Sequence, residues 1–220
     1  MFLLIFLVNL FTLPANPVKR RSMVNFRSFG IFFRNRQMFA FLLLMMFFGI
    51  SVSPLMSFIN LYYKDIGASS SFIGWVLFVQ AVPEIPAYIV GTRIVKRIGA
   101  ERTILIAMGV SFLRMVLYGL TRDPDVAIMF SIFHCITIAF FLLGVVEYVQ
   151  FRTPAHLRTT GQALIWAFHY GAGVSLGNIL LGYLRGTVGM LSAMHIHALL
   201  ALLIFVLTVL FFKFLNEKAD

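Results

Sequence analysis

Long apolar stretches separated by short polar joints dominate the chain. Six of them reach the roughly 20 residues that a helix needs to cross the hydrocarbon core of a bilayer. They cover residues 38–62, 72–94, 103–120, 126–148, 160–184 and 190–212. The joints carry Gly, Pro and charged residues, which is typical of turns. The pattern therefore predicts an all-α integral membrane protein whose six transmembrane helices occupy residues 38–212.

Composition agrees with a lipid environment. The 220 residues are 60% hydrophobic and 12% charged, whereas a soluble domain carries about a quarter charged residues. The single cysteine, Cys135, excludes a disulfide framework, an iron-sulfur cluster and a Cys-based zinc site, because each needs several thiolates. We expect no cofactor and no metal.

The basic residues alternate between the two ends of the predicted helices. One set of alternate joints, with the tail, holds 14 of the 18 Lys and Arg residues, and the other set holds three. The positive-inside rule places the richer set in the cytoplasm. We therefore expect a multi-pass protein of the cell membrane, with a basic cytoplasmic loop at 14–37 and a cytoplasmic tail at 213–220. Because topology explains the net charge of +10, no nucleic-acid partner is expected.

Residues 1–13 are apolar but span only about 20 Å as a helix, which is too short to cross the membrane. A signal peptide would export the basic loop that follows, so we reject that interpretation. We predict the remnant of a preceding transmembrane helix, with an interfacial anchor as the alternative.

Six helices with both flanking segments on one side of the membrane can form two triplets of opposite orientation. Such inverted repeats are common in secondary transporters. The second helix of each triplet ends in a similar Gly- and Arg-containing segment, at 91–99 and 182–189. We therefore predict two inverted three-helix repeats.

The segment that ends the second helix supplies the most specific motif. It comprises Gly91, Lys96, Arg97, Gly99 and Arg102. This cytoplasmic loop resembles the basic, glycine-turn loop between the second and third helices of each half of major facilitator superfamily transporters. The commonest form of that loop has an acidic residue about where Lys96 stands.

Further segments extend the resemblance over about 37–212. Residues 111–114, 133–134 and 141–144 fall in the order and spacing of the C-terminal half of lactose permease and related proton symporters. Residues 62–69, 83–86 and 153–162 are similar to the phenylpropionate or nucleoside transporter-like branch.

The resemblance implies a twelve-helix fold, of which this chain would supply the C-terminal six-helix half. Its partners would be the missing N-terminal half or a second copy, the lipid bilayer, a small solute and protons. The implied function is secondary active transport by proton-coupled symport of a small organic solute such as a sugar, a nucleoside or an aromatic acid.

Ionisable residues inside the predicted helices need a partner or a function, because burying them in hydrocarbon is costly. Glu84, Arg114 and His169 all lie about 15 Å from the cytoplasmic ends of their helices. The shared depth predicts an ion pair between Glu84 and Arg114, with His169 or Tyr170 nearby. Glu84 also lies between Pro83 and Pro86, and interrupted helices at this depth are where transporters bind substrate and ions. A pair that only locks two helices together is the alternative.

Other polar residues are candidates for the substrate pathway. His134 corresponds to the histidine of the tenth helix of lactose permease, but Thr137 stands where a carboxylate is found one turn later. We therefore assign proton coupling to Glu84. Gln80 and Glu147 complete the pathway candidates, although Glu147 could instead meet Arg152 near the inner end of its helix.

The remaining marked residues are interpreted structurally. Gly173 and Gly177 form a small-xxx-small pair suited to close helix packing. Pro54 predicts a kink in the first helix. His195 and His197 are expected at the outer membrane surface, where their spacing makes a poor metal pair.

Two other functional classes compete with transport. An intramembrane metalloprotease would use Glu147, His134 and His169, but no His lies at i+4 from another metal-ligand type. We therefore expect that the chain is not an enzyme. A helical membrane scaffold or inactive remnant stays open, because the chain has half the length of a complete transporter.

Overall fold

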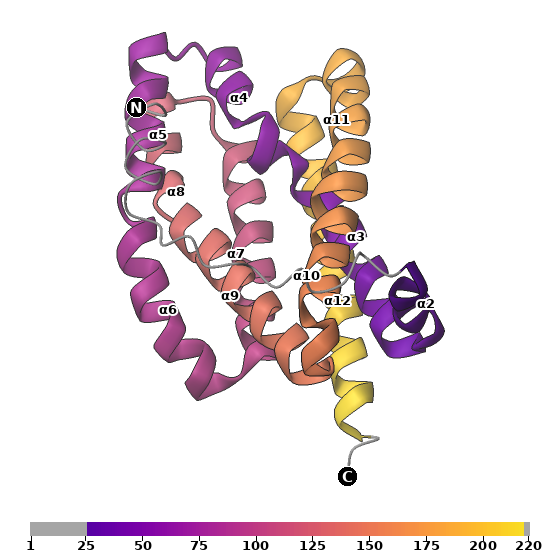
Figure 1. Cartoon of the computed structure of the whole chain (residues 1–220). Helices are drawn as coiled ribbons and strands as arrows, with labels where there is room; N and C mark the ends of the chain where they lie inside the picture. The colour runs from indigo at the N-terminus through magenta and orange to yellow at the C-terminus, as the bar shows by residue number, and fades with distance from the viewer. Residues whose placement is uncertain (1–25, 218–220) are drawn as a thin grey trace, which may run out of the picture.

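The structure is a computed structural model that describes residues 26–217, and every regular element in that range is a helix (Figure 1). The described elements are α2 (Phe26–Arg34), α3 (Arg36–Ser57), α4 (Ile59–Asp65), α5 (Ser70–Ala81), α6 (Glu84–Ile98), α7 (Ala100–Leu120), α8 (Pro124–Ser131), α9 (His134–Arg152), η1 (Ala155–Leu157), α10 (Arg158–Trp166), η2 (Ala167–Val174), α11 (Ser175–Val188) and α12 (Met190–Glu217). Together they form six segments long and apolar enough to span a membrane. The prediction of six spanning helices is confirmed.

Three of the six spans change geometry along their length. The second is divided into α5 and α6 at Val82 and Pro83, and the fourth into α8 and α9 at Ile132 and Phe133. In the fifth, the π-helix η2 separates α10 from α11. Proline explains the first of these breaks, because Pro83 lacks the N–H that a continuous helix would require.

The first predicted helix, at 38–62, is also two elements. The side chain of Asn35 caps α3 by accepting from the backbone N–H groups of Gln37 and Met38. The helix passes through Pro54 and ends at Ser57, and α4 begins at Ile59.

Helix packing follows the predicted inverted repeat. In the first triplet α3 packs on η2, α11 and α12, and in the second α9 packs on α6 and α7. In each triplet, therefore, the first helix packs on the second and third helices of the other triplet. The third helices of the two triplets, α7 and α12, pack on each other. Both sets of contacts are those expected of an inverted repeat.

The two turns that precede the third helices have the same backbone. Gly99 has φ 88° and ψ 162°, and Gly189 has φ 83° and ψ 165°. A side chain is strained at positive φ, so both turns use glycine. This equivalence supports the match between residues 91–99 and 182–189.

The ends of the bundle carry the alternating charges. At the lower end of Figure 1 lie the turn from α6 to α7, the junction of α9 with α10 and the end of α12. The upper end holds the turns from α4 to α5 and from α11 to α12. The basic joints therefore share one end, whose cytoplasmic placement stays a prediction.

Two segments predicted to lie outside the membrane contain helical residues, and their placement stays a prediction. The described part of the loop predicted at 14–37 contains helix α2, which ends at Arg34, one residue before the Asn35 cap of α3. The tail predicted at 213–220 is helical as far as Glu217, where α12 ends. The remnant helix predicted at 1–13 lies outside the described residues.

Tyrosines and one ion pair organise the upper end. The hydroxyls of Tyr63 and Tyr118 each lie 2.9 Å from the hydroxyl of Ser131. Burial raises the pKa of Tyr63 far above its usual value, so this phenol stays neutral.

Arg185 donates two hydrogen bonds of 2.8 Å to the carboxylate of Asp65, which joins α11 to α4.

Candidate functional site

Arg114 is the most deeply placed charge of the described bundle. It comes from α7 and has no exposed surface. Its Nη1 donates to the hydroxyl of Thr137 at 2.9 Å and lies 3.5 Å from Nδ1 of His134, both on α9. The guanidinium carbon lies 5.8 Å from the ring centroid of Tyr118. Arg114 therefore ties α7 to the α8–α9 span at the level where that span is broken.

The guanidinium of Arg114 is incompletely satisfied. Its Nε and Nη2 are buried and have no hydrogen-bond partner within the described residues. A buried charge without a partner is costly. The structure thus holds a cation with two free donor groups, a state suited to receiving an anion or a water molecule.

The predicted ion pair between Glu84 and Arg114 is absent from this conformation. Residues 26–217 contain two acid–base pairs within 4.0 Å, Arg152 with Glu101 and Arg185 with Asp65. Glu84 opens α6 directly after the break at Pro83 and is only half-buried. Matched depth along two helices therefore did not bring these two side chains together, because depth does not fix the side of the helix from which each one projects.

Glu84 instead belongs to a group of residues from two spans. It interacts with the phenol of Tyr88 one turn along α6, and electrostatically with Tyr170 of η2. Arg114 lies at the start of α9 through its contacts with His134 and Thr137, and the structure shows no direct contact between Glu84 and Arg114. Tyr88 was missed by the sequence analysis, although its i+4 spacing from Glu84 could have indicated it.

His169 has a structural role in this conformation. Only 1% of its surface is exposed, and Nδ1 donates to the carbonyl oxygen of Met45 at 2.9 Å. Its ring lies 4.6 Å from that of Phe141 and 5.7 Å from that of Phe48, measured between centroids. It thus joins η2 to α3 and α9.

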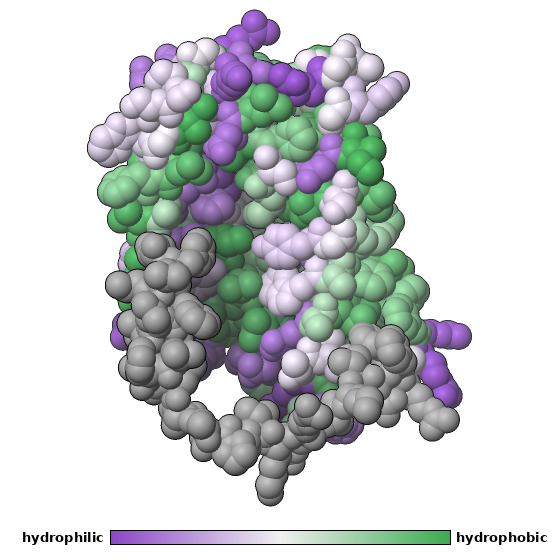
Figure 2. Space-filling model, turned by 45° about the horizontal axis from the view of Figure 1, so that its top comes forward, coloured by the Kyte–Doolittle hydropathy of each residue, from purple (hydrophilic) through white to green (hydrophobic). Residues whose placement is uncertain are grey.

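Tyr170, the residue after His169, is 38% exposed. Its ring packs 5.6 Å from that of Trp166, a residue that the sequence analysis had not selected. Figure 2 shows a band of pale and purple residues running down the middle of one face between green, apolar flanks. Tyr170 and Trp166 therefore provide two adjoining aromatic faces on this span.

The other pathway candidates lie apart from this group or are enclosed. Gln80 is 7% exposed, and its buried Nε2 has no partner among the described residues. Glu147 is half-buried on α9 toward the lower end of the bundle. The contact considered between Glu147 and Arg152 is replaced by the pair of Arg152 with Glu101, at 3.0 Å.

His197 corrects the prediction of a surface position. It is fully buried, and its Nδ1 lies 3.1 Å from the carbonyl oxygen of Ile50 and 3.3 Å from that of Ser51. Pro54 cannot donate to the carbonyl four residues before it, so the carbonyl of Ile50 lacks its helical partner. The proline was the available signal, since it predicts a carbonyl that needs another donor.

Close backbone packing surrounds these histidines. A Cβ at Gly173 would meet the carbonyl oxygen of Met46, and a Cβ at Gly177 would meet that of Ile50. The small-xxx-small pair therefore lies in the contact between α3 and the η2–α11 span, as predicted for helix packing.

Comparison with known proteins identifies the family. The sequence profile of the MFS_1 like family matches residues 7–196. The chain belongs to this family. The resemblance to major facilitator superfamily transporters is thereby confirmed, and the metalloprotease alternative is set aside because the family and fold are not enzymatic.

Two individual relatives agree with this assignment. The chain is 25% identical over 164 residues to YwbF of Bacillus subtilis (strain 168), an uncharacterized transporter, covering 74% of this chain and 41% of YwbF. A crystal structure of a mutant of the nucleoside transporter NupG superposes with a TM-score of 0.78 and 18% identity. That match covers 95% of this chain and 58% of NupG. The chain thus has the fold of a major facilitator protein and spans less than two thirds of either relative.

Proposed function

We propose that the chain is one half of a secondary active transporter that moves a small organic solute together with protons across the cell membrane. Family membership and the superposition on part of NupG support this proposal. The observation that carries it is the fully buried Arg114, whose Nε and Nη2 have no hydrogen-bond partner among the described residues. A purely structural bundle has no need for an unsatisfied cation at this depth.

Proton coupling would arise if the contact between Glu84 and Arg114 changes during the transport cycle. In the present conformation Glu84 and Arg114 form no ion pair within 4.0 Å, and an Arg beside a carboxylate favours its ionised form. A shift at the break between α5 and α6 that brings Glu84 to Arg114 favours release of the proton. The opposite shift favours uptake, and the alternation would couple proton movement to the conformational cycle.

The proposed solute carries a ring and groups that donate hydrogen bonds. Tyr170 and Trp166 offer aromatic faces, and Glu84 accepts hydrogen bonds from hydroxyl or amino groups. A sugar, a nucleoside or an aromatic acid fits this description in part. A nucleoside combines a flat base with hydroxyl groups, and NupG is a nucleoside transporter.

A second six-helix unit is required by the proposal. Alternating access moves one half of such a fold against the other around a site between them. The missing N-terminal half or a second copy of this chain would supply it. An inactive remnant or helical scaffold is the competing function.

Reconstitution distinguishes the two functions. The purified chain is placed in proteoliposomes alone and together with a candidate N-terminal half, and exchange of a radiolabelled nucleoside, sugar or aromatic acid is measured. The proposal expects exchange of at least one solute class by the combined halves and none by the monomeric chain. Absence of exchange for all three classes in both preparations would favour the scaffold.

A further inference from the structure

The guanidinium of Arg114 has one edge that nothing in the described chain occupies. Its Nη1 donates to Thr137 at 2.9 Å and lies 3.5 Å from Nδ1 of His134. The guanidinium carbon lies over the ring of Tyr118, 5.8 Å from the centroid. Nε and Nη2 direct their N–H groups from the same edge of the planar group, and neither has a partner among the described residues. The contacts that position Arg114 therefore leave this Nε–Nη2 edge available.

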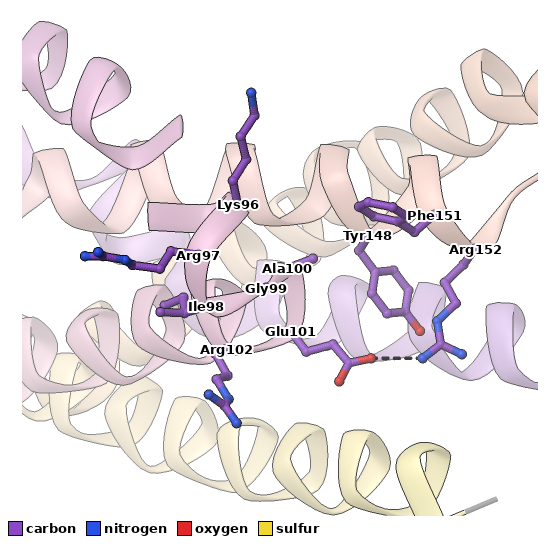
Figure 3. Close-up of a pocket in the computed structure, with 10 residues that line it drawn as sticks. All are labelled: Lys96, Arg97, Ile98, Gly99, Ala100, Glu101, Arg102, Tyr148, Phe151 and Arg152. Atoms are coloured by element: carbon purple, nitrogen blue, oxygen red, sulfur yellow. Dashed lines mark hydrogen bonds and ion pairs between the residues drawn. The ribbon is translucent and has the colours of Figure 1, made fainter. Parts of the chain in front are cut away.

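Other arginines of the chain show what binds to such an edge. Arg185 directs Nε and Nη2 to the two carboxylate oxygens of Asp65, both at 2.8 Å. At the lower end of the bundle, Arg152 donates from Nη2 to a carboxylate oxygen of Glu101 at 3.0 Å (Figure 3). Guanidinium and carboxylate groups are planar and have matching spacing, which makes the bidentate pair specific as well as strong. The free edge of Arg114 therefore fits a carboxylate.

The described residues do not supply that carboxylate in this conformation. The two acid–base pairs within 4.0 Å in residues 26–217 do not include Arg114. The side chain of Arg185 is 40% exposed, so water solvates part of its charge, whereas Arg114 has no exposed surface. A buried cation without an anionic partner is costly. An anion that binds this edge would remove that cost.

Arg114 lies close to a break in the fourth span. Helix α8 ends at Ser131 and α9 begins at His134. His134, which lies beside the guanidinium, is only half-buried. Interrupted helices inside the membrane are where transporters bind solutes. A shift at this break would open a short path from the surface past His134 to the enclosed Arg114.

We infer that the Nε–Nη2 edge of Arg114 binds the carboxylate of the transported solute, which is therefore an organic acid. Of the three solute classes considered above, the aromatic acid carries this group. The assignment of the carboxylate to a solute rests on the proposed transport function. The edge holds one carboxylate at a time, so the acid and Glu84 would occupy it alternately.

Equilibrium binding of radiolabelled benzoate to the full-length chain in lipid nanodiscs at pH 7 tests the edge. Benzamide is the matched competitor, since it has the same planar shape but presents an NH₂ donor in place of one acceptor oxygen. We expect unlabelled benzoate to displace the label and benzamide to be at least about tenfold less effective. Equal displacement by the two compounds would overturn the inference, as would the absence of saturable benzoate binding. This comparison uses the native chain alone.

Variants locate the binding at Arg114. Arg114→Gln should weaken benzoate binding by about tenfold or more. Arg114→Lys should also weaken it, because an ammonium group keeps the charge but lacks the edge with two parallel donors. Arg185→Gln is the matched control and should stay within about twofold of the native affinity, since Asp65 already fills that edge. An equal loss in Arg114→Gln and Arg185→Gln would overturn the assignment to Arg114.

Two rival occupants of the edge are tested in the same assay. Glu84→Gln removes the internal carboxylate, so benzoate affinity should stay the same or rise. A tenfold loss would mean that benzoate is held through Glu84 and would contradict the inference. Chloride and inorganic phosphate are compared with benzoate at constant ionic strength. Displacement of the label by either ion at the concentration at which benzoate acts would assign the edge to an inorganic anion and overturn the organic acid.

Failure of this inference can be distinguished from failure of the proposed function. Exchange of a nucleoside or a sugar by the combined halves, without benzoate binding to the chain, would support transport and overturn the carboxylate site. Benzoate binding that depends on Arg114, without exchange of any solute class by the combined halves, would support the site. It would contradict the assignment of the carboxylate to a transported solute.

Discussion

The imidazole Nδ1 of His197 donates to the carbonyl oxygen of Ile50 at 3.1 Å, and Pro54 is the residue that would otherwise have satisfied that carbonyl. A side chain of α12 thus replaces a backbone hydrogen bond of α3. The bond is formed inside the bundle, where His197 is fully buried. It allows α3 to contain a proline without leaving an unpaired carbonyl in a region that water does not reach.

This relationship predicts a specific loss of stability. His197→Phe removes the donor and leaves the carbonyl of Ile50 unsatisfied, which should lower the free energy of unfolding by about 1–3 kcal/mol. Unfolding in detergent micelles with increasing sodium dodecyl sulfate measures the change. The exposed His156 on η1 provides a control, since His156→Phe should change stability by less than about 0.5 kcal/mol.

A double-mutant cycle separates the hydrogen bond from packing. Pro54→Ala restores an N–H at position 54, so the carbonyl of Ile50 no longer depends on the imidazole. The cost of His197→Phe should then fall by about 1 kcal/mol. An unchanged cost in the Pro54→Ala background would show that His197 acts through packing alone.

Two glycines in one span should differ sharply in tolerance. A Cβ at Gly173 would meet backbone atoms of α3, whereas a Cβ at Gly171 would meet nothing within 4 Å. Gly173→Ala should therefore cost about 1–3 kcal/mol through overpacking, and Gly171→Ala should be neutral or slightly stabilising. Equal effects in the same unfolding assay would place the contact between α3 and η2 elsewhere.

The spans and their order could be predicted from the sequence because a membrane-spanning helix is recognised by the summed hydrophobicity of about 20 consecutive residues. Apolar length gave six helices, and the equivalence of Gly99 with Gly189 was visible as a shared segment ending. Both turns have positive φ at glycine. Both features are local, so each is determined by residues that are close together in the sequence.

Side-chain partners were less predictable because they depend on rotation about helix axes and on breaks. Glu84 and Arg114 share a depth, yet they form no ion pair within 4.0 Å. His169 and His197 were expected to differ, with one central and one at the surface, but both donate to carbonyl oxygens of α3. Counting residues along a helix gives the depth of a side chain but not the side of the helix from which it projects. That side decides which side chains meet.

Arg114 should show opposite effects on stability and on transport. Because two of its nitrogens lack partners, Arg114→Leu should leave the free energy of unfolding unchanged or raise it by about 1–3 kcal/mol. The same variant should abolish accumulation of solute by the assembled transporter. A loss of 3 kcal/mol or more would instead assign Arg114 a purely structural role.

Thr137 provides the matched test of the one good hydrogen bond of Arg114. Thr137→Val removes the acceptor at nearly constant volume and should destabilise the native chain by about 1–3 kcal/mol. The hydroxyl of Thr137 also donates to the carbonyl oxygen of His134 at 2.8 Å, so in the Arg114→Leu background the cost of the same change should fall by about 1 kcal/mol rather than vanish. An unchanged cost there would contradict the bond of 2.9 Å from Arg114.

Sidedness follows from the distribution of charge. In a variant lacking Cys135, single cysteines at Arg97 or Arg158 should resist a membrane-impermeant thiol reagent added to intact cells, and react after permeabilisation. A cysteine at Arg122 should react in intact cells. Labelling of position 97 from outside would reverse the predicted orientation.

Glu84→Gln tests the central claim most directly. Counterflow and proton-driven accumulation of the same solute are compared in proteoliposomes that contain the active assembly. The amide keeps the size of the side chain but cannot release a proton, so proton-driven accumulation should fall to background. Counterflow should stay within about threefold of the native rate, because solute binding and alternating access do not require titration of this residue. Accumulation against a gradient at the native rate by the Glu84→Gln assembly would contradict the assignment of proton coupling to this carboxylate.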